Sequence, residues 1–236
     1  MKRPPIPILY QDEHLLIVNK PPRIASVPSP GIFLNSTVMG KVQKENIDPQ
    51  HGKPYLLHRL DYDTSGVLCF GKQKKDRALL EAIFKGPAKN DSAGHKATTH
   101  KRYVALVMGI PTGEVITKPL PGRTSSEKIP AQTYYKVRQT FKIPGLTCAL
   151  VEAEIKTGRK HQIRQHFASI GHPVALDIKY GNRPFNRKFN KIFHMGRQFL
   201  HAETLTFYHP FLEKEITVTA PYPPDMKFAL KRLNEL

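Results

Sequence analysis

The chain has 236 residues, of which 39% are hydrophobic and 24% are charged, a balance typical of a folded globular protein that excludes an intrinsically disordered one. Its 37 Lys and Arg outnumber its 19 Asp and Glu, which gives a formal net charge of +18. Such an excess is expected of a protein that binds a nucleic-acid backbone, although a merely cationic soluble protein would also show it.

Short apolar runs at the start of the chain predict a β-hairpin, with strands at residues 6–10 and 15–18. Residues 28–54 are rich in Pro, Gly, Ser and Asn, and they predict a loop with one short helix. A strand is expected at residues 67–71. Asp76 can then cap a helix, and the apolar face of that helix is expected to consist of Leu79, Leu80, Ile83 and Phe84.

The second part of the chain is richer in strand signals than in helix signals. Its polar, Gly- and Pro-bearing residues 85–100 predict an exposed loop, and residues 111–130 predict irregular chain. β-branched and aromatic residues predict further strands at 103–108, 132–137, 147–155, 200–207 and 215–219.

Two helices are expected between and after these strands. Thr157 can cap the first, at residues 159–170, and Gly171 can end it. Its apolar stripe is expected to be Ile163, Phe167 and Ile170. The second is expected at residues 225–233.

Strands outnumber helices, and most connections are too short for parallel crossovers. We therefore expect an α+β fold with a mixed, largely antiparallel central β-sheet flanked by helices and loops. We expect a single domain over residues 1–236, with its core at about 6–233 and no separate N-terminal RNA-binding domain.

Cys69 and Cys148 are too few and too far apart for a disulfide framework or a zinc site, and both lie in apolar runs where burial is expected. No apolar run approaches the roughly 20 residues that span a bilayer, and no signal-peptide core follows the N-terminus. We expect a cytoplasmic protein, or one soluble in a nucleoid or organelle matrix, without a membrane or metal partner.

Half of the net charge lies in less than a fifth of the chain. From Lys156 to Arg197 there are ten Lys or Arg and one acid, Asp177. A bound polyanion is the best way to offset such repulsion. Arg164 lies one helical step from the apolar Ile163, so it is expected to be half-buried and to need a carboxylate.

The same segment contains Phe185, Phe189 and Phe193, which recur every four residues. This spacing is typical of the packed face of a helix and not of a base-stacking platform. The cations on the remaining faces are expected to project towards phosphates, and they are Arg183, Arg187, Lys188 and Lys191.

Three segments carry residues suited to chemistry. Residues 58–66, HRLDYDTSG, hold Asp61 in a turn that ends at Gly66. Residues 101–109, KRYVALVMG, form a strand with a basic start that contains Tyr103. Residues 157–166, TGRKHQIRQH, gather basic groups at a helix N-terminus, which suits a phosphate.

Each segment also has an ordinary interpretation. Asp61 can be an Asx-turn acceptor or a helix cap, and Tyr103 can be a core residue. The third segment can be a solvated basic face.

Together these segments resemble, in order and spacing, the three sequence motifs of the RluA-type pseudouridine synthase family. The resemblance covers about residues 7–228, since Asn19-Lys20-Pro21-Pro22 resembles the N-terminal turn of the family and residues 200–210 its C-terminal strand. Gly71 stands where Ala is usual, Leu176 replaces a frequent Gly, and residues 85–100 look longer than typical. None of these departures falls on a residue to which the resemblance assigns a catalytic role.

The resemblance implies that Asp61 is the catalytic aspartate, that Tyr103 stacks on the target base and that Arg164 pairs with Asp61. It also implies that Arg59 enters the RNA stack as the base swings out and that Leu200 walls the pocket. The expected substrate-binding residues are His58, Arg59, Thr64, Lys101, Arg159, His161, Gln162 and Leu200.

The implied reaction breaks the N1–C1′ bond of uridine and rejoins the ring through C5, so it needs neither a metal nor an organic cofactor. It needs an ionised carboxylate near C1′, a pocket that keeps the detached uracil, and extrusion of the nucleotide. Arg164 would keep Asp61 ionised, and Tyr103 could assist removal of the C5 proton. Whether Asp61 attacks C1′ or removes a sugar proton is left open.

Two other classes of function were compared with this one. A non-catalytic RNA-binding or ribosome-assembly protein on the same scaffold could lose Asp61, Tyr103 or Arg164, yet all three are present. A metal-dependent nuclease or hydrolase is disfavoured, because His161 and His166 are five residues apart with no carboxylate between them. The expected partner is a stem-loop of rRNA or tRNA, bound by a monomer.

Overall fold

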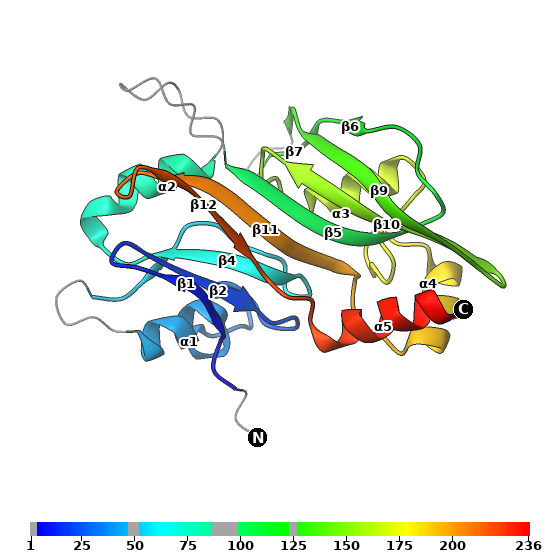
Figure 1. Ribbon diagram of the computed structural model, residues 1–236, viewed down its shortest axis with the longest axis horizontal. Helices are drawn as coiled ribbons and strands as arrows, with labels where there is room; N and C mark the ends of the chain where they lie inside the picture. The colour runs from blue at the N-terminus through cyan, green and yellow to red at the C-terminus, as the bar shows by residue number, and fades with distance from the viewer. Residues whose placement is uncertain (1–3, 47–51, 86–98, 123–126) are drawn as a thin grey trace. The chain divides into compact units, whose positions relative to one another are not determined.

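The computed structural model describes residues 4–46, 52–85, 99–122 and 127–236 (Figure 1). Contacts between residues divide the chain into two units. Unit 1 comprises residues 1–100 and 202–221, and unit 2 comprises residues 101–201 and 222–236. The expectation of a single domain stays a prediction.

Unit 1 is built on a sheet with the strand order β1-β2-β4-β11, in which β3 also pairs with β4 and β12 with β11. The pairs β1–β2, β2–β4, β3–β4 and β11–β12 are antiparallel. Its strands are β1 (Ile8–Gln11), β2 (Leu15–Lys20), β3 (Tyr55–Leu56), β4 (Ser65–Gly71), β11 (Leu200–His209, from Ala202 onward) and β12 (Lys214–Thr219). Its helices are α1 (Val38–Glu45) and α2 (Arg77–Lys85), with 3₁₀ turns at Leu34–Ser36 and Lys74–Asp76.

Unit 2 has the strand order β5-β10-β9-β6 and a separate pair, β7–β8, all antiparallel. Its strands are β5 (His100–Met108, from Lys101 onward), β6 (Val115–Thr117), β7 (Leu120–Pro121), β8 (Lys128–Ile129), β9 (Gln132–Ile143) and β10 (Leu146–Ile155). Its helices are α3 (Gln162–Ser169), α4 (Arg183–Phe193) and α5 (Pro224–Glu235). Figure 1 shows the long strands β9 and β10 side by side, as their pairing requires.

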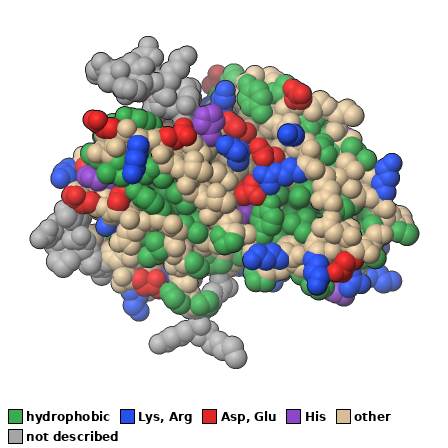
Figure 2. Space-filling view, in the orientation of Figure 1, with side chains coloured by type: hydrophobic (Ala, Val, Ile, Leu, Met, Phe, Trp, Pro, Cys, Tyr) green, Lys and Arg blue, Asp and Glu red, His purple; other side chains and the backbone are tan. Residues whose placement is uncertain are grey.

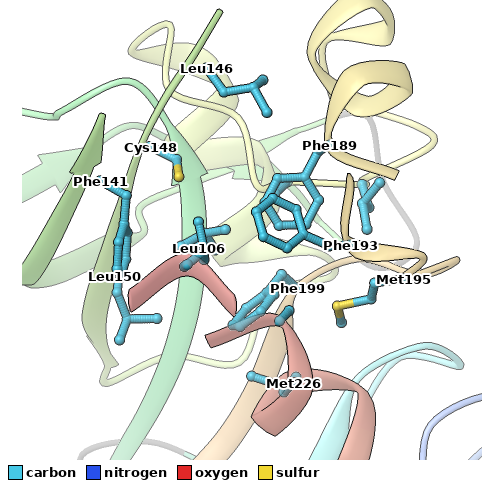
Figure 3. Packing of buried hydrophobic residues seen from close by; sticks show 14 of the residues in the cluster. Leu106, Phe141, Leu146, Cys148, Leu150, Phe189, Phe193, Met195, Phe199 and Met226 are labelled. Atoms are coloured by element: carbon cyan, nitrogen blue, oxygen red, sulfur yellow. The ribbon is translucent and has the colours of Figure 1, made fainter. Parts of the chain in front are cut away.

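The apolar pattern of each strand explains its place in the core. In unit 1 every residue of β4 is buried, as expected for a strand covered on both faces. In unit 2, Phe189 and Phe193 of α4 meet side chains of the sheet, such as Leu106 and Cys148, and Met226 of α5 (Figure 3). The predicted Phe stripe of α4 is therefore confirmed, as are the α+β class and the largely antiparallel pairing.

Several sequence-based details are confirmed and others are wrong. Cys69 and Cys148 are free and buried, as expected. α3 begins at Gln162 and not at residue 159, because Thr157 binds the Gln162 side chain and does not cap the helix. Leu79 and Ile170 are 47% and 37% exposed, so they do not belong to the packed faces of their helices.

The loop predictions were partly right. Residues 28–54 contain the expected short helix, α1. Residues 111–130 were expected to be irregular, but they contain the short strands β6, β7 and β8. Most of the loop expected at 85–100 lies outside the described residues. Within the described ranges, no helix is long and apolar enough to cross a membrane.

The packing around Gly71 explains why this chain has a glycine where Ala is usual in the family it resembles. The Tyr55 ring occupies the space that a Cβ at position 71 would fill, and the Tyr55 hydroxyl donates to the Gln73 carbonyl at 3.1 Å. A glycine is therefore required here by the packing of Tyr55.

We predict that Gly71→Ala lowers the free energy of unfolding by about 1–3 kcal/mol, the usual effect of overpacking a core. Urea denaturation measures it. Gly158→Ala is the matched control, because nothing lies within 4 Å of a Cβ built there and its stability should be close to that of wild type. Equal midpoints for Gly71→Ala and Gly158→Ala would contradict the packing role of Tyr55.

Candidate active site

The loop that carries Asp61 is held by a buried lysine from β2. Lys20 has no exposed surface, and its Nζ donates to the carbonyl oxygens of Pro21, Tyr62 and Thr64 at 3.0, 3.1 and 2.7 Å. These three carbonyl oxygens match the three donors of the ammonium group. Two of these acceptors lie just after Asp61 in the chain and fix the backbone there.

The segment that follows Lys20 fixes the other side of the loop. Ser26 Oγ donates to the Leu60 carbonyl at 2.8 Å and accepts from the Leu60 amide at 3.1 Å. The Thr64 amide donates to the Asp61 carbonyl at 3.1 Å and closes a turn. The backbone of Asp61 is thus held on both sides, while its residue surface is only half-buried.

Gly66 ends the loop, with φ at +114°, as its position in the motif predicts. Any side chain at this position would run into the backbone of Ala202, which lies in β11 and also belongs to unit 1. Gly66 is therefore needed both for its φ and for the close approach of β11.

The remaining expected site residues of unit 1 differ in role. Arg59 is exposed, as a residue that contacts RNA must be. Thr64 is buried, and its carbonyl accepts from Lys20. His58 Nε2 accepts from the Cys69 amide at 3.2 Å, and its ring stacks on Phe84 at 5.9 Å. These contacts support a positioning role for His58 and Thr64.

In unit 2, Tyr103 and Lys101 lie on β5, opposite Ala153 and Ile155 of β10, and both are mostly buried. Leu200 is buried at the start of β11, as expected of an apolar wall.

Arg164 makes a two-bond ion pair with Asp177. Its Nε and Nη2 donate to Asp177 Oδ2 and Oδ1 at 2.6 and 2.9 Å. The two side chains are 8% and 0% exposed, so the carboxylate expected near Arg164 exists and is fully buried. The predicted pairing of Arg164 with Asp61, which lies in the other unit, stays a prediction.

Asp177 is held ionised by its surroundings. Burial alone would raise the pKa of its carboxyl group, but the hydrogen bonds from Arg164 and from the Tyr180 and Lys179 amides, with the charge of Arg164, outweigh burial and lower it. The carboxylate therefore stays charged at neutral pH and fixes the orientation of Arg164.

The side-chain amide of Gln162 holds the chain at the N-terminus of α3 in place. Gln162 Oε1 accepts from Thr157 Oγ1 at 2.9 Å and from the Arg159 amide at 3.1 Å, while its Nε2 donates to the Gln132 carbonyl at 2.8 Å. His161 has φ at +54°, and its Nδ1 lies 3.1 Å from the Tyr180 hydroxyl. Gln162 is buried, and these bonds favour a role in holding the loop over contact with RNA.

The turn around Asp177 explains the second departure from the family pattern. Leu176 has φ at +61°, a conformation that favours glycine. It is held there because its amide donates to Asn186 Oδ1 at 2.7 Å, while Asn186 Nδ2 donates to the Asp177 carbonyl at 3.0 Å.

Sequence reasoning gave no role to Lys20, Ser26, Asn186 or Asp177. Two signals were available. Lys20 is the one charged residue of β2, and Asp177 is the single acid of the basic segment that contains Arg164. Ser26 and Asn186 gave no such signal, because their side chains bind backbone groups, which carry no mark in the sequence.

The basic segment from Lys156 to Arg197 does not present all of its cations at the surface, where a polyanion could bind them. Arg164 and Arg197 are buried and paired with Asp177 and Asp225. The cations of α4 itself are exposed, as predicted, and Figure 2 shows Lys and Arg side chains over the part of unit 2 where Figure 1 labels α4 and α5. These exposed residues of α4 are Arg183, Arg187, Lys188 and Lys191.

We predict that Lys20→Met lowers the free energy of unfolding by about 3 kcal/mol or more, because it leaves buried carbonyl groups without a donor. Chemical denaturation measures it. Lys72→Met is the control, since Lys72 is half-buried and its Nζ donates to the Asp12 carbonyl; its cost should be about 1 kcal/mol. Similar losses in the two variants would argue against a special role for Lys20.

Asp177→Asn should lower the free energy of unfolding by about 3–5 kcal/mol at neutral pH, because Arg164 remains buried without its counter-charge. The lowered pKa of Asp177 gives a sign to the pH dependence. The stability that it contributes is present above the unfolded pKa, about 3.9, and is lost as the pH falls through the lower folded pKa. The difference between wild type and variant should therefore shrink in that acid window; a difference independent of pH would contradict the ion pair.

Comparison with known proteins agrees with this geometry. The RNA pseudouridylate synthase family matches residues 14–169. The ribosomal large subunit pseudouridine synthase C of Vibrio cholerae is 33% identical over 97% of this chain and 69% of its own length. The uncharacterized RNA pseudouridine synthase YhcT of Bacillus subtilis is 34% identical over 93% of this chain and 70% of its own length.

Among solved structures, human RNA pseudouridylate synthase domain containing 4 superposes with a TM-score of 0.75 over 97% of this chain and 93% of its own, at 24% identity, which supports the same fold. With the motifs in order, the family match over most of the chain and relatives matched over more than two thirds of their length, the chain belongs to the RNA pseudouridylate synthase family and is an RNA isomerase.

Proposed function

We propose that this enzyme isomerises particular uridines in a stem-loop of large-subunit rRNA or of tRNA, with Asp61 as the carboxylate that acts at the sugar. The observation that carries this proposal is the construction of the Asp61 loop. Lys20 and Ser26 hold the backbone on both sides of Asp61, while the residue itself keeps accessible surface. A rigid backbone with an accessible carboxylate suits a group that must meet C1′ at a fixed position.

The other roles follow from the chemistry of the reaction. Arg59, exposed two residues before Asp61, enters the RNA stack as the target nucleotide leaves it. Tyr103 stacks on the detached uracil, and Leu200 provides an apolar wall. Arg164, already oriented by Asp177, keeps Asp61 ionised when the site is assembled.

The choice of RNA rests on the names of two relatives and on the charge of the chain. The Vibrio cholerae and Pasteurella multocida relatives are named for the large ribosomal subunit. A stem-loop occurs in both rRNA and tRNA, and the cations exposed on α4 suit its phosphate backbone. Chemical mapping of pseudouridine in cellular RNA, with and without the gene, identifies the site directly; a map that does not change would contradict the proposal.

We predict that Asp61→Asn forms no pseudouridine yet binds RNA as well as wild type or slightly better, since a negative charge near the phosphates is removed. Release of tritium from C5-labelled uridine measures turnover, and filter binding measures affinity. Asp63→Asn is the matched control, because it removes a charge from the same loop two residues away and should retain most activity. Turnover by pure Asp61→Asn would disprove the catalytic role.

A further inference from the structure

Ile178 presents an apolar side chain to solvent at the tip of the turn that holds Arg164. It is 90% exposed, more than any other large hydrophobic side chain in the described part of the chain. It directly follows Asp177, whose carboxylate is fully buried against Arg164. Single exposed apolar residues are common on proteins, so the exposure needs further observations to gain meaning.

The first observation is that the turn is firmly held. Asp177 Oδ1 accepts from the amides of Lys179 and Tyr180 at 2.9 and 3.0 Å, so the backbone on the C-terminal side of Ile178 is bonded to the residue before it. Asn186 binds Leu176 and the Asp177 carbonyl on the other side. Ile178 therefore stands out from a fixed turn, and binding there would cost little backbone entropy.

The second observation is the charge around the tip. Lys179 follows Ile178, is exposed, and has its Nζ 5.2 Å from the centre of the Tyr180 ring. Arg183 begins α4 a few residues later and is also exposed. Asp177, the single acid of this segment, is buried and paired, so its charge is not offered to a partner. An apolar tip among cations is complementary to a nucleotide, which has an apolar base face and an anionic phosphate.

We propose that Ile178 packs against the face of a base that neighbours the target uridine and so helps to select the RNA. The inference rests on the proposed function. When a nucleotide leaves its stack, the neighbouring base exposes a face to water, and apolar side chains are used by other proteins to cover such faces. Ile178 is well placed for this, because it directly follows Asp177, whose carboxylate fixes Arg164. Lys179 would contact the adjoining phosphate.

The test compares Ile178→Ala with Ile170→Ala, an exposed isoleucine of the same unit just after α3. Partial loss of the apolar contact should raise the KM for the RNA by roughly five- to tenfold. The kcat should not change, because the contact is made equally before and during the reaction. Ile170→Ala should match wild type, and Ile178→Leu should keep a low KM. Both alanine variants should melt at the temperature of wild type.

The chain contains no Trp, which permits a second readout of contact. Ile178→Trp and Ile170→Trp would each carry a single Trp, in an Asp61→Asn background that binds RNA without turnover. Saturating stem-loop RNA should quench the emission of the Ile178→Trp protein and leave that of the Ile170→Trp protein unchanged. An unchanged KM for Ile178→Ala, or equal quenching of the two Trp variants, would overturn the inference.

The failure of the inference and that of the proposed function give different results. If the proposed function is wrong, wild-type protein forms no pseudouridine in any mapped RNA. If only the role of Ile178 is wrong, wild type and Ile178→Ala form pseudouridine with the same KM. If the inference is right, the rise in KM and the quenching appear together at position 178 and not at position 170.

Discussion

The buried ammonium group of Lys20 is the constraint on which the loop that carries Asp61 depends. Removing a charge from water is costly, and here three carbonyl oxygens offset part of that cost. Lys20 is also the register partner of Gly66 across β2 and β4, so the strand pairing and the ammonium bonds fix the same loop.

In unit 2 the corresponding buried charge is negative, and it is the carboxylate of Asp177. Asp177 collects donors from Arg164 and from two backbone amides, and Arg164 is therefore oriented before any RNA binds. In the proposed mechanism, such preorganisation reduces the reorganisation needed during catalysis. It also changes how mutants are interpreted. A loss of stability in Arg164→Ala is explained by its buried partner Asp177, so only activity measurements report on the proposed pairing with Asp61.

The sequence predicted most of the strands, the Phe stripe of α4 and the motif segments, because these depend on local periodicity and spacing. Prediction from the sequence failed where contacts with other parts of the chain determine where a helix begins or which of its residues pack. α3 starts late because Gln162 binds Thr157 and Gln132, and Leu79 lies outside the packed face of α2. The sequence predicted a carboxylate for Arg164, but not which one, since that depends on the turn fixed by Asn186. The meeting of Asp61 with residues of unit 2 stays a prediction.

The close approach of Gly66 to Ala202 has a consequence for how the protein is made. Unit 1 is discontinuous, and residues 101–201 lie between its two segments. At about 5–20 residues per second, the ribosome needs roughly 5–20 s to synthesise that insertion. During this time the Asp61 loop lacks the β11 backbone against which Gly66 packs. β4 therefore lacks its β11 neighbour in the sheet until residues 202–209 have been synthesised.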